Sequence, residues 1–285
     1  MPHPEGPTML VAPSSSPSVR WWSTVVAPRE ALTPSSAKSM PAILTVPSGA
    51  ERVRCRPMSD PSLLERLRAV DTSTLSDADK AIPLPDPGIR SIHDRVLLVG
   101  RAFTVTAHDN LLSVIEGLTR AEPGDVLVIE TGGGAGATMG EIFATEAIRR
   151  GLAGFVIDGV CRDLATLREL AMPVFARGAV PNAAAAQAEP RVGEPVRIGG
   201  VEVNAGDLVV GDLDGLLIAP PERMEAALEI AEGIKRREGA LMAWMQQGGG
   251  LLDGLTYEEH LAALRAGETS SLSFREDPSQ PRASG

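Results

Sequence analysis

The sequence predicts a single α/β domain that contains a parallel βαβ unit, and three observations support this fold class. Short apolar runs alternate with longer stretches of helical period, the order expected of strands that alternate with helices. Gly, Pro and Asp turns separate these runs. The length of 285 residues and the hydrophobic fraction of 43% suit one sizeable core with irregular flanking segments.

Each helix or strand is expected where a periodic pattern of apolar residues coincides with residues that typically begin or end such an element. Helices are expected where apolar residues recur with a period of 3.6, and they cover residues 63–70, 75–81, 111–120, 140–150, 164–170 and 222–244. Strands are expected where short apolar runs follow turn residues, as after Gly124-Asp125 and Gly206-Asp207. The expected strands cover residues 96–99, 102–107, 126–129, 154–157, 174–177, 196–198, 201–203, 208–210 and 215–218.

Composition divides the chain into three parts. Residues 1–57 are rich in Pro and Ser and show neither the helical period of 3.6 nor the strand period of 2, which predicts a disordered extension. A related hypothesis is that translation starts naturally at Met58, which an intact-mass measurement of the native protein would test. Residues 58–267 carry the periodic patterns and form the expected catalytic domain, and residues 268–285 are expected to be a disordered tail.

Charge and residue usage exclude several classes of protein. The formal charge of -10 argues against a nucleic-acid partner, which would need clustered Lys and Arg. No apolar run approaches the roughly 20 residues of a membrane-spanning helix, so no membrane partner is expected. Two cysteines are too few for a disulfide framework or a cysteine metal cage. We expect a cytoplasmic protein.

The segment 139–163 is the most informative part of the chain. Gly140-Glu141 opens a predicted helix, and the predicted loop 158–163 ends in Arg162-Asp163. In a parallel βαβ unit these two ends would face one another at the carboxyl edge of the sheet, where open α/β sheets bind ligands. Carboxylates bind Mg²⁺ or Mn²⁺, and Arg can hold a carboxylate or enolate oxygen. This combination of groups indicates a 2-oxo acid site.

Simpler interpretations exist for these residues taken one at a time. Glu141 alone would complement the helix dipole, and Asp163 alone would cap the next helix. The glycine-rich stretch 132–140 lacks the spacing of a dinucleotide fingerprint and the Gly-Lys-Ser/Thr of a Walker loop. It therefore predicts either a flexible loop or helix-start N–H groups that receive an anionic ligand.

At these residues the chain resembles the RraA-like family, which includes class II 4-hydroxy-4-methyl-2-oxoglutarate/4-carboxy-4-hydroxy-2-oxoadipate aldolases. The most specific element is an acid, 20 intervening residues and then Arg-Asp, supplied here by Glu141 and Arg162-Asp163. Segments 151–159, 173–178 and 206–215 also look similar, and the resemblance covers roughly residues 63–251. It implies a swivelling α/β sandwich of αββαβ type, assembled as a homotrimer or a dimer of trimers.

The resemblance also implies roles for residues. Asp163 would be the protein ligand of Mg²⁺ or Mn²⁺, Glu141 would hold metal-bound water, and Arg162 would contact the substrate. The backbone amides of Gly140, Glu141, Ile142 and Phe143 would bind the substrate carboxylate, as a helix start allows. Asp77 and Glu238 would be contributed from a neighbouring subunit.

The activity implied is cleavage of a 4-hydroxy-2-oxo acid to pyruvate by a retro-aldol reaction, with oxaloacetate decarboxylation through the same enolate. Two positions differ from the family pattern. Ala186 stands where known aldolases have Lys, which leaves the natural substrate open, and Glu141 replaces the more usual Asp. The alternative is a binding protein that regulates ribonuclease E, a role given to family members that lack the complete acid-Arg-Asp set.

Overall fold

The structure is a computed structural model that describes residues 61–279, all of which belong to one compact unit. The predictions for residues 1–57 lie outside the described residues. Within the described part, the helices are α1 Pro61–Leu67, α2 Thr72–Ala78, α3 Leu111–Arg120, α4 Glu141–Arg150, α5 Leu164–Glu169, α6 Pro221–Gln246, the 3-10 helix η1 Leu251–Gly254 and α7 Tyr257–Arg265. None of the described helices is both long and apolar enough to cross a membrane.

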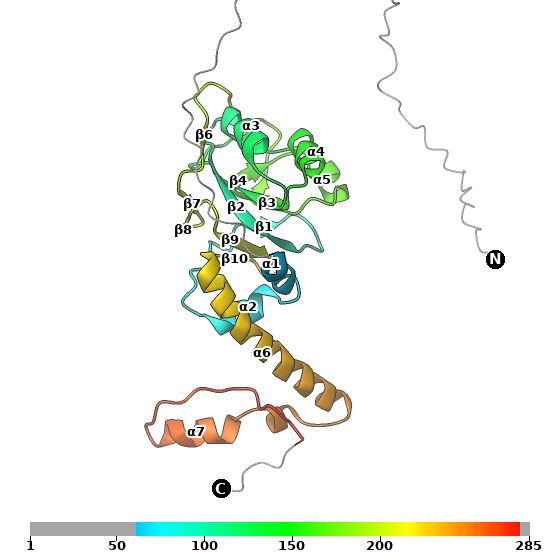
Figure 1. Cartoon of the computed structure of the whole chain (residues 1–285), viewed down its shortest axis with the longest axis vertical. Helices are drawn as coiled ribbons and strands as arrows, with labels where there is room; N and C mark the ends of the chain where they lie inside the picture. Colours follow the sequence, from blue (N-terminus) through cyan, green and yellow to red (C-terminus); the bar gives the residue numbers. More distant parts are fainter. Residues whose placement is uncertain (1–60, 280–285) are drawn as a thin grey trace, which may run out of the picture. The chain divides into compact units, whose positions relative to one another are not determined.

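The centre of the described chain is an eight-stranded mixed sheet (Figure 1). Its strands are β1 Arg90–Ser91, β2 Leu98–Thr106, β3 Asp125–Glu130, β4 Gly154–Cys161, β5 Val174–Ala179, β6 Arg191–Val192, β9 Leu208–Gly211 and β10 Leu216–Ala219. The spatial order is β1-β5-β4-β3-β2-β9-β10, and β6 pairs with β2 off this path. Strands β2 to β5 are parallel to one another, whereas β1, β6, β9 and β10 pair antiparallel with their neighbours. The α/β prediction with a parallel unit is confirmed.

Helices α3, α4 and α5 cover one face of the parallel strands. Every residue of β3 except Glu130 is buried, because the strand is covered on both faces. Leu127, Ile129, Phe155 and Ile157 point to the helix side and pack with buried residues of α3, α4 and α5. This packing fixes the start of α4 relative to the ends of β3 and β4.

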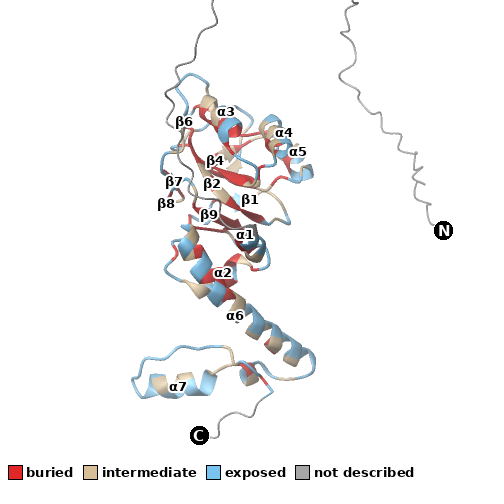
Figure 2. Ribbon diagram, in the orientation of Figure 1, coloured by how far each residue is buried: buried red, intermediate tan, exposed pale blue. Residues whose placement is uncertain are grey.

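The opposite face of the parallel strands and the β9–β10 part of the sheet are covered by other elements. The hairpin of β7 Val196–Ile198 and β8 Val201–Val203 packs against the face opposite α3 to α5. Helices α1, α2 and the first half of α6 pack against strands β9 and β10. Figure 2 shows buried residues along the sheet between these layers, where they form three hydrophobic clusters, one for each of these packing surfaces. The result is a mixed α/β fold with a curled sheet.

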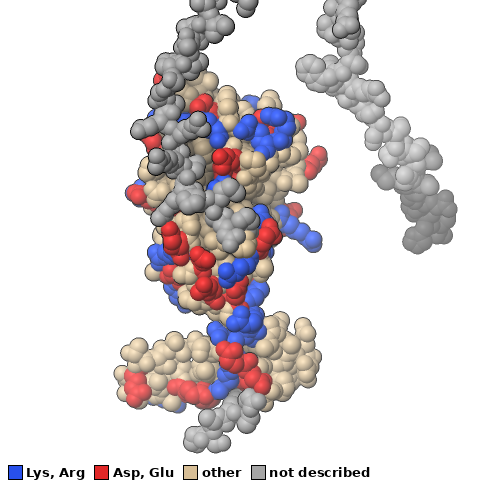
Figure 3. Space-filling model, viewed as in Figure 1, with Lys and Arg blue, Asp and Glu red and all other residues tan. Residues whose placement is uncertain are grey.

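Helix α6 is tied to the helices at the start of the described chain by ion pairs. Arg223 Nε donates to Asp79 Oδ2 at 2.7 Å, and Arg66 Nε donates to Glu232 Oε1 at 2.8 Å. These guanidinium groups hold the pKa values of Asp79 and Glu232 below their usual range. On the face drawn in Figure 3, basic and acidic side chains are interspersed in this region.

The structure differs from the sequence prediction at several boundaries. Two strands were expected where β2 is continuous through Gly100, whose position has no room for a side chain because a Cβ would lie 2.5 Å from Gly124 O. Helix α2 begins at Thr72, earlier than expected, because Asp71 caps it by accepting from Thr74 N. The short strands β1 and β6 and the helix α7 were not predicted.

The described chain continues past residue 267, where a disordered tail was predicted. Phe274 forms an isolated antiparallel bridge with Leu255. Arg275 N donates to Gly254 O at 2.8 Å, and its Nε donates to Leu255 O at 3.0 Å. Residues 268–279 therefore make defined contacts with η1 and the start of α7, whereas residues 280–285 lie outside the described part.

Candidate active site

The predicted site lies where β4 ends beside the start of α4. The sequence predicted a loop over 158–163, and this was wrong for residues 158–161, which continue β4 because Val160 and Cys161 pair with β5 after a register shift. Only Arg162 and Asp163 separate β4 from α5. The approach to α4 runs alongside this strand end, since Thr138 N donates to Val160 O at 3.2 Å and Arg162 N donates to Met139 O at 3.0 Å.

Asp163 turns its side chain toward α4 and away from the helix that it precedes. It occupies the N-cap position of α5 but makes no side-chain capping hydrogen bond there. Its Oδ2 instead accepts from the backbone N–H of Glu141 at 3.1 Å. Asp163 also has a left-handed backbone, with φ 62° and ψ 37°, a conformation that Asp tolerates better than most residues. The simple capping interpretation of Asp163 is therefore wrong.

Gly140 allows this close approach. It is the N-cap of α4, with an extended φ of -158° that any residue could adopt. A Cβ at this position would lie 2.5 Å from Asp163 Oδ2 and 2.9 Å from Arg162 Cγ. The contact with Arg162-Asp163, and not the backbone conformation of residue 140, thus favours glycine here, because a Cβ would displace these side chains.

Arg162 and Asp163 retain capacity to bind a ligand. Arg162 Nε lies 3.6 Å from Asp163 Oδ2, too far for a good hydrogen bond, and both side chains are 39% exposed. Within residues 61–279 no protein acceptor is found for the Arg162 guanidinium other than this carboxylate. The pair therefore presents donors and acceptors to solvent.

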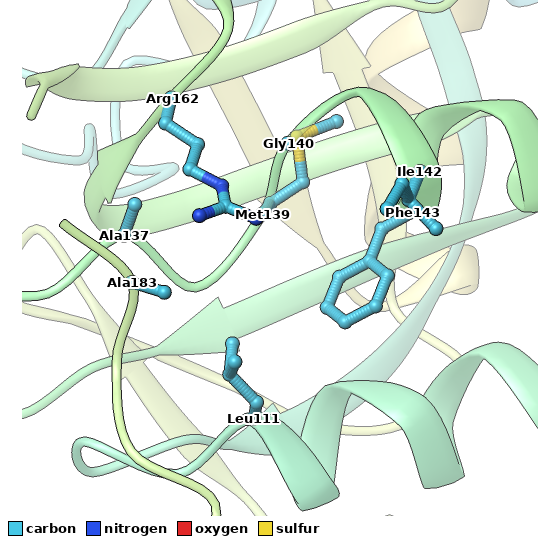
Figure 4. Close-up of a pocket in the computed structure, with 8 residues that line it drawn as sticks. All are labelled: Leu111, Ala137, Met139, Gly140, Ile142, Phe143, Arg162 and Ala183. Atoms are coloured by element: carbon cyan, nitrogen blue, oxygen red, sulfur yellow. The ribbon is translucent and has the colours of Figure 1, made fainter. Parts of the chain in front are cut away.

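A pocket opens beside Arg162 (Figure 4). It has an empty volume of ≈ 310 Å³ including its mouth, and its lining residues are Leu111, Ala137, Met139, Gly140, Ile142, Phe143, Arg162 and Ala183. Figure 4 shows the Arg162 side chain directed toward Ala137 and Met139, while the Phe143 ring points toward Leu111. Of the predicted substrate-binding set, the structure brings Gly140, Ile142, Phe143 and Arg162 together around this pocket, whereas Glu141 is not among the lining residues, and the binding role of the set stays a prediction.

Four lining residues were missed by the sequence analysis. Leu111 begins α3, Ala137 and Met139 precede α4, and Ala183 lies after β5. Leu111 and Ala183 come from segments far from 139–163 in the sequence, so no local pattern indicates their position. Ala137 and Met139 are apolar residues directly before the predicted helix start, and this proximity is the feature that a sequence argument could have used.

The start of α4, whose residues line this pocket, has unpaired backbone donors. The first N–H groups of an α-helix have no partner within the helix. Among the described residues, no acceptor is found for the N–H groups of Ile142 and Phe143, whereas that of Glu141 is taken by Asp163. These donors and the positive end of the helix dipole favour an anion beside Arg162.

The donor set determines which metal the site could hold. Within residues 61–279 there is no group of three or more His, Cys, Asp or Glu side chains that could enclose a metal ion. Asp163 and Glu141 offer oxygen only, and the cradle at Gly140 leaves the Asp163 carboxylate partly exposed. One or two carboxylates with several retained waters fit Mg²⁺ and do not fit a closed zinc site.

Asp77 and Glu238 are not brought to this site by their own chain. Asp77 belongs to α2, where its Oδ1 lies 3.8 Å from Lys80 Nζ, and Glu238 belongs to α6. Both helices pack on the β9–β10 part of the sheet, away from α4 and α5 (Figure 1). A role for either residue therefore requires a neighbouring subunit and stays a prediction.

Cys161 is a packing residue. It is fully buried at the end of β4, and its Sγ donates to Gly178 O at 3.5 Å. Burial raises the pKa of the thiol, so Arg162 does not activate it.

Known proteins resemble this chain in sequence and structure. The chain is 33% identical over 171 residues to a protein of Halalkalibacterium halodurans, covering 59% of this chain and 81% of that one. It is 32% identical over 154 residues to a Thermus thermophilus protein named 4-hydroxy-4-methyl-2-oxoglutarate aldolase, covering 54% of this chain and 92% of the relative.

A solved structure confirms the expected sandwich fold. It is a Streptomyces coelicolor protein described as an unusual member of the RNase ES inhibitor RraA protein family, with 29% identity and a TM-score of 0.57. The alignment covers 63% of this chain and 95% of that one. The family model described as RraA-like, Aldolase/RraA, matches residues 72–218, which span all of the site described above. The chain belongs to the RraA-like family.

Proposed function

We propose that this protein is a divalent-metal-dependent lyase that cleaves a 4-hydroxy-2-oxo acid by a retro-aldol reaction and releases pyruvate. The observation that carries the proposal is the open Arg162-Asp163 pair held against Gly140 at the start of α4. An anion-binding helix start, a guanidinium and an oxygen-donor carboxylate are the groups that a 2-oxo acid requires. The aldolase name of the Thermus thermophilus relative supports the same reaction class.

Some residues of the site bind the substrate, and others stabilise the negative charge that develops during the reaction. The N–H groups of Ile142 and Phe143 bind the substrate carboxylate, and Arg162 holds the 2-oxo oxygen as negative charge develops on it. When bound by Asp163, with Glu141 acting through water, Mg²⁺ or Mn²⁺ supplies Lewis-acid polarisation of the 2-oxo group. Glu141, exposed at the first position of α4, receives the proton of the 4-hydroxyl through water.

Cleavage breaks two bonds of the substrate. The O–H bond of the 4-hydroxyl breaks, C4 becomes a carbonyl, and the C3–C4 electron pair enters the enolate of pyruvate beside Arg162. The proton that Glu141 received through water then passes to C3 and completes pyruvate. Oxaloacetate reaches the same enolate by losing carbon dioxide from C4, so we propose decarboxylation as a second reaction of this site.

The test is pyruvate release from 4-hydroxy-2-oxopentanoate, 4-hydroxy-4-methyl-2-oxoglutarate and oxaloacetate, each with Mg²⁺ or with EDTA. We expect release that depends on metal and is lost in Asp163→Ala. Asp94→Ala, which removes an exposed carboxylate in the turn before β2, is the matched control and should retain activity. No release above the metal-only background from any of the three acids would overturn the lyase proposal.

A second candidate function is regulation of a ribonuclease. It is favoured by the Streptomyces coelicolor structure, whose description names the RNase ES inhibitor family. Inhibition of ribonuclease E cleavage of a defined RNA by the full chain, unchanged in Asp163→Ala, would support this function. The same result without any pyruvate release would favour it over the lyase.

A further inference from the structure

The pocket beside Arg162 has one charged wall and otherwise apolar walls. Arg162 is the only charged residue among its eight lining residues in the described chain, and the other seven are Gly, Ala, Leu, Ile, Met or Phe. The proposed function assigns Arg162 and the α4 N–H groups to the 2-oxo acid end of the substrate. No cation of the described pocket lining then remains for a second carboxylate at the distal end.

The wall across from Arg162 is made by Leu111 and Phe143. The Phe143 ring points toward Leu111 in Figure 4, and Phe143 also packs against the core cluster under α3 to α5. A carboxylate placed between these side chains would lose water without gaining a partner, which is strongly unfavourable. An alkyl group at the same place would gain apolar contact.

Backbone hydrogen bonds hold the segment that bears Ala183 against the pocket. Ala137 N donates to Asn182 O at 2.9 Å, and Ala184 N donates to Ala137 O at 3.0 Å. Gly136 lies so close to this segment that a Cβ would be 2.6 Å from Ala184 Cα. The segment is therefore fixed, and the side chain that it adds to the pocket is a methyl group.

From this lining we infer that the substrates are 4-hydroxy-2-oxo monocarboxylic acids with an uncharged, apolar group on C4. This inference rests on the proposed function and specifies its substrate class. The products would be pyruvate and a simple aldehyde or ketone that carries the apolar group. The C3–C4 bond breaks as described above, so no further reactant is needed.

A matched pair of uncleavable ligands tests the inference by binding alone. 2-Oxopentanoate and 2-oxoglutarate have the same chain length and lack the 4-hydroxyl, and they differ in a terminal methyl group against a carboxylate. Titration calorimetry on the full chain with Mg²⁺ should give at least tenfold tighter binding of 2-oxopentanoate, roughly the discrimination that one buried unpaired polar group produces.

The outcomes separate this inference from the proposed function. Equal or tighter binding of 2-oxoglutarate would overturn the inference and leave the lyase proposal standing. Absence of binding by both acids would overturn both, because the 2-oxo acid end is common to the two ligands.

A charge placed in the wall should reduce the preference for 2-oxopentanoate. Ala183→Lys adds a cation to the pocket lining and is expected to tighten 2-oxoglutarate binding about tenfold, the effect of one charge-assisted contact. Gln187→Lys adds the same charge to an exposed position of the same segment and should change neither affinity. Equal effects of the two substitutions would show that long-range charge, and not the pocket wall, sets the preference.

Discussion

The molecule contains two arginine–carboxylate assemblies that involve β4, one directly after this strand and one between it and β5, and they differ in how fully their groups are paired. In the first, Arg162 and Asp163 follow β4, are 39% exposed, and lie 3.6 Å apart. In the second, Arg177 of β5 donates through Nε to Asp158 Oδ1 and through Nη1 to Asp86 Oδ2 at 3.1 Å. Asp158 Oδ2 also accepts from Gly199 N at 2.7 Å.

This difference distinguishes a candidate binding site at Arg162 from a structural ion-pair network at Arg177. The Arg177 assembly uses both oxygens of Asp158 for protein donors and ties β4 and β5 to the β7–β8 turn and to the segment before β1. The Arg162 assembly leaves guanidinium donors and carboxylate oxygens for a ligand. The same chemical groups thus stabilise the fold in one place and remain available for binding in the other.

The largest expected effect comes from removing the Arg162 guanidinium. Arg162→Gln should lower the rate of pyruvate release roughly 100- to 1,000-fold, because a charge-stabilising donor to the developing oxyanion is lost. Steady-state kinetics with the preferred 2-oxo acid measures this effect. Arg265→Gln, which changes an exposed arginine of α7, is the control. A rate equal to wild type in Arg162→Gln would contradict the assignment.

Crowding the open pair should have the next largest effect. Gly140→Ala introduces a Cβ where Asp163 Oδ2 would be only 2.5 Å away, so the carboxylate must move. We expect pyruvate release to fall about 100-fold, the cost of displacing a catalytic group by about an ångström. Gly178→Ala is the matched control, since a Cβ there meets nothing within 4 Å. Similar losses in both variants would point to a general effect of replacing glycine.

A substitution in the fully paired Arg177 assembly should lower the stability of the protein and leave its activity unchanged. Asp158→Asn would present an NH₂ group to Arg177 or to Gly199 N–H, both of which are donors. We expect the free energy of unfolding to fall by about 2 kcal/mol, as measured by urea denaturation. Pyruvate release by the folded variant should be unchanged. A selective loss of activity would place Asp158 in the site and contradict a purely structural role of the Arg177 assembly.

The smallest expected effect is a pH dependence at Asp86. The N–H of Gly88 and the Arg177 guanidinium hold the pKa of this carboxyl below its usual value of 3.8. Because the folded pKa is the lower one, ionised Asp86 stabilises the protein above pH 3.8, and that stability is lost as the pH falls through the folded pKa. The unfolding midpoints of wild type and Asp86→Asn should therefore differ near neutral pH and converge in acid. A constant difference would contradict this linkage.

Much of the fold was predictable because its signals are local. Helix α3 and strands β7 and β8 have the predicted bounds, since their periods and flanking turns are complete within a few residues. Strand β2 was predicted as two pieces that leave out Gly100 and Arg101, whereas in the structure it is continuous there, and a Cβ on Gly100 would lie 2.5 Å from Gly124 O. The short strands β1 and β6 have no pattern of their own and exist only through pairing with β5 and β2.

The sequence by itself determined the residue types of the site and their order along the chain: a helix start at Gly140-Glu141 and a strand end at Arg162-Asp163. Tertiary structure decided which of these groups are free. Asp158 and Asp163 are the same residue type in the sequence. Strand pairing places Asp158 beside Arg177 and Gly199, which donate to its carboxylate. The left-handed backbone of Asp163 instead directs its carboxylate to α4. Pairing of that kind depends on contacts between distant segments, which no local period records.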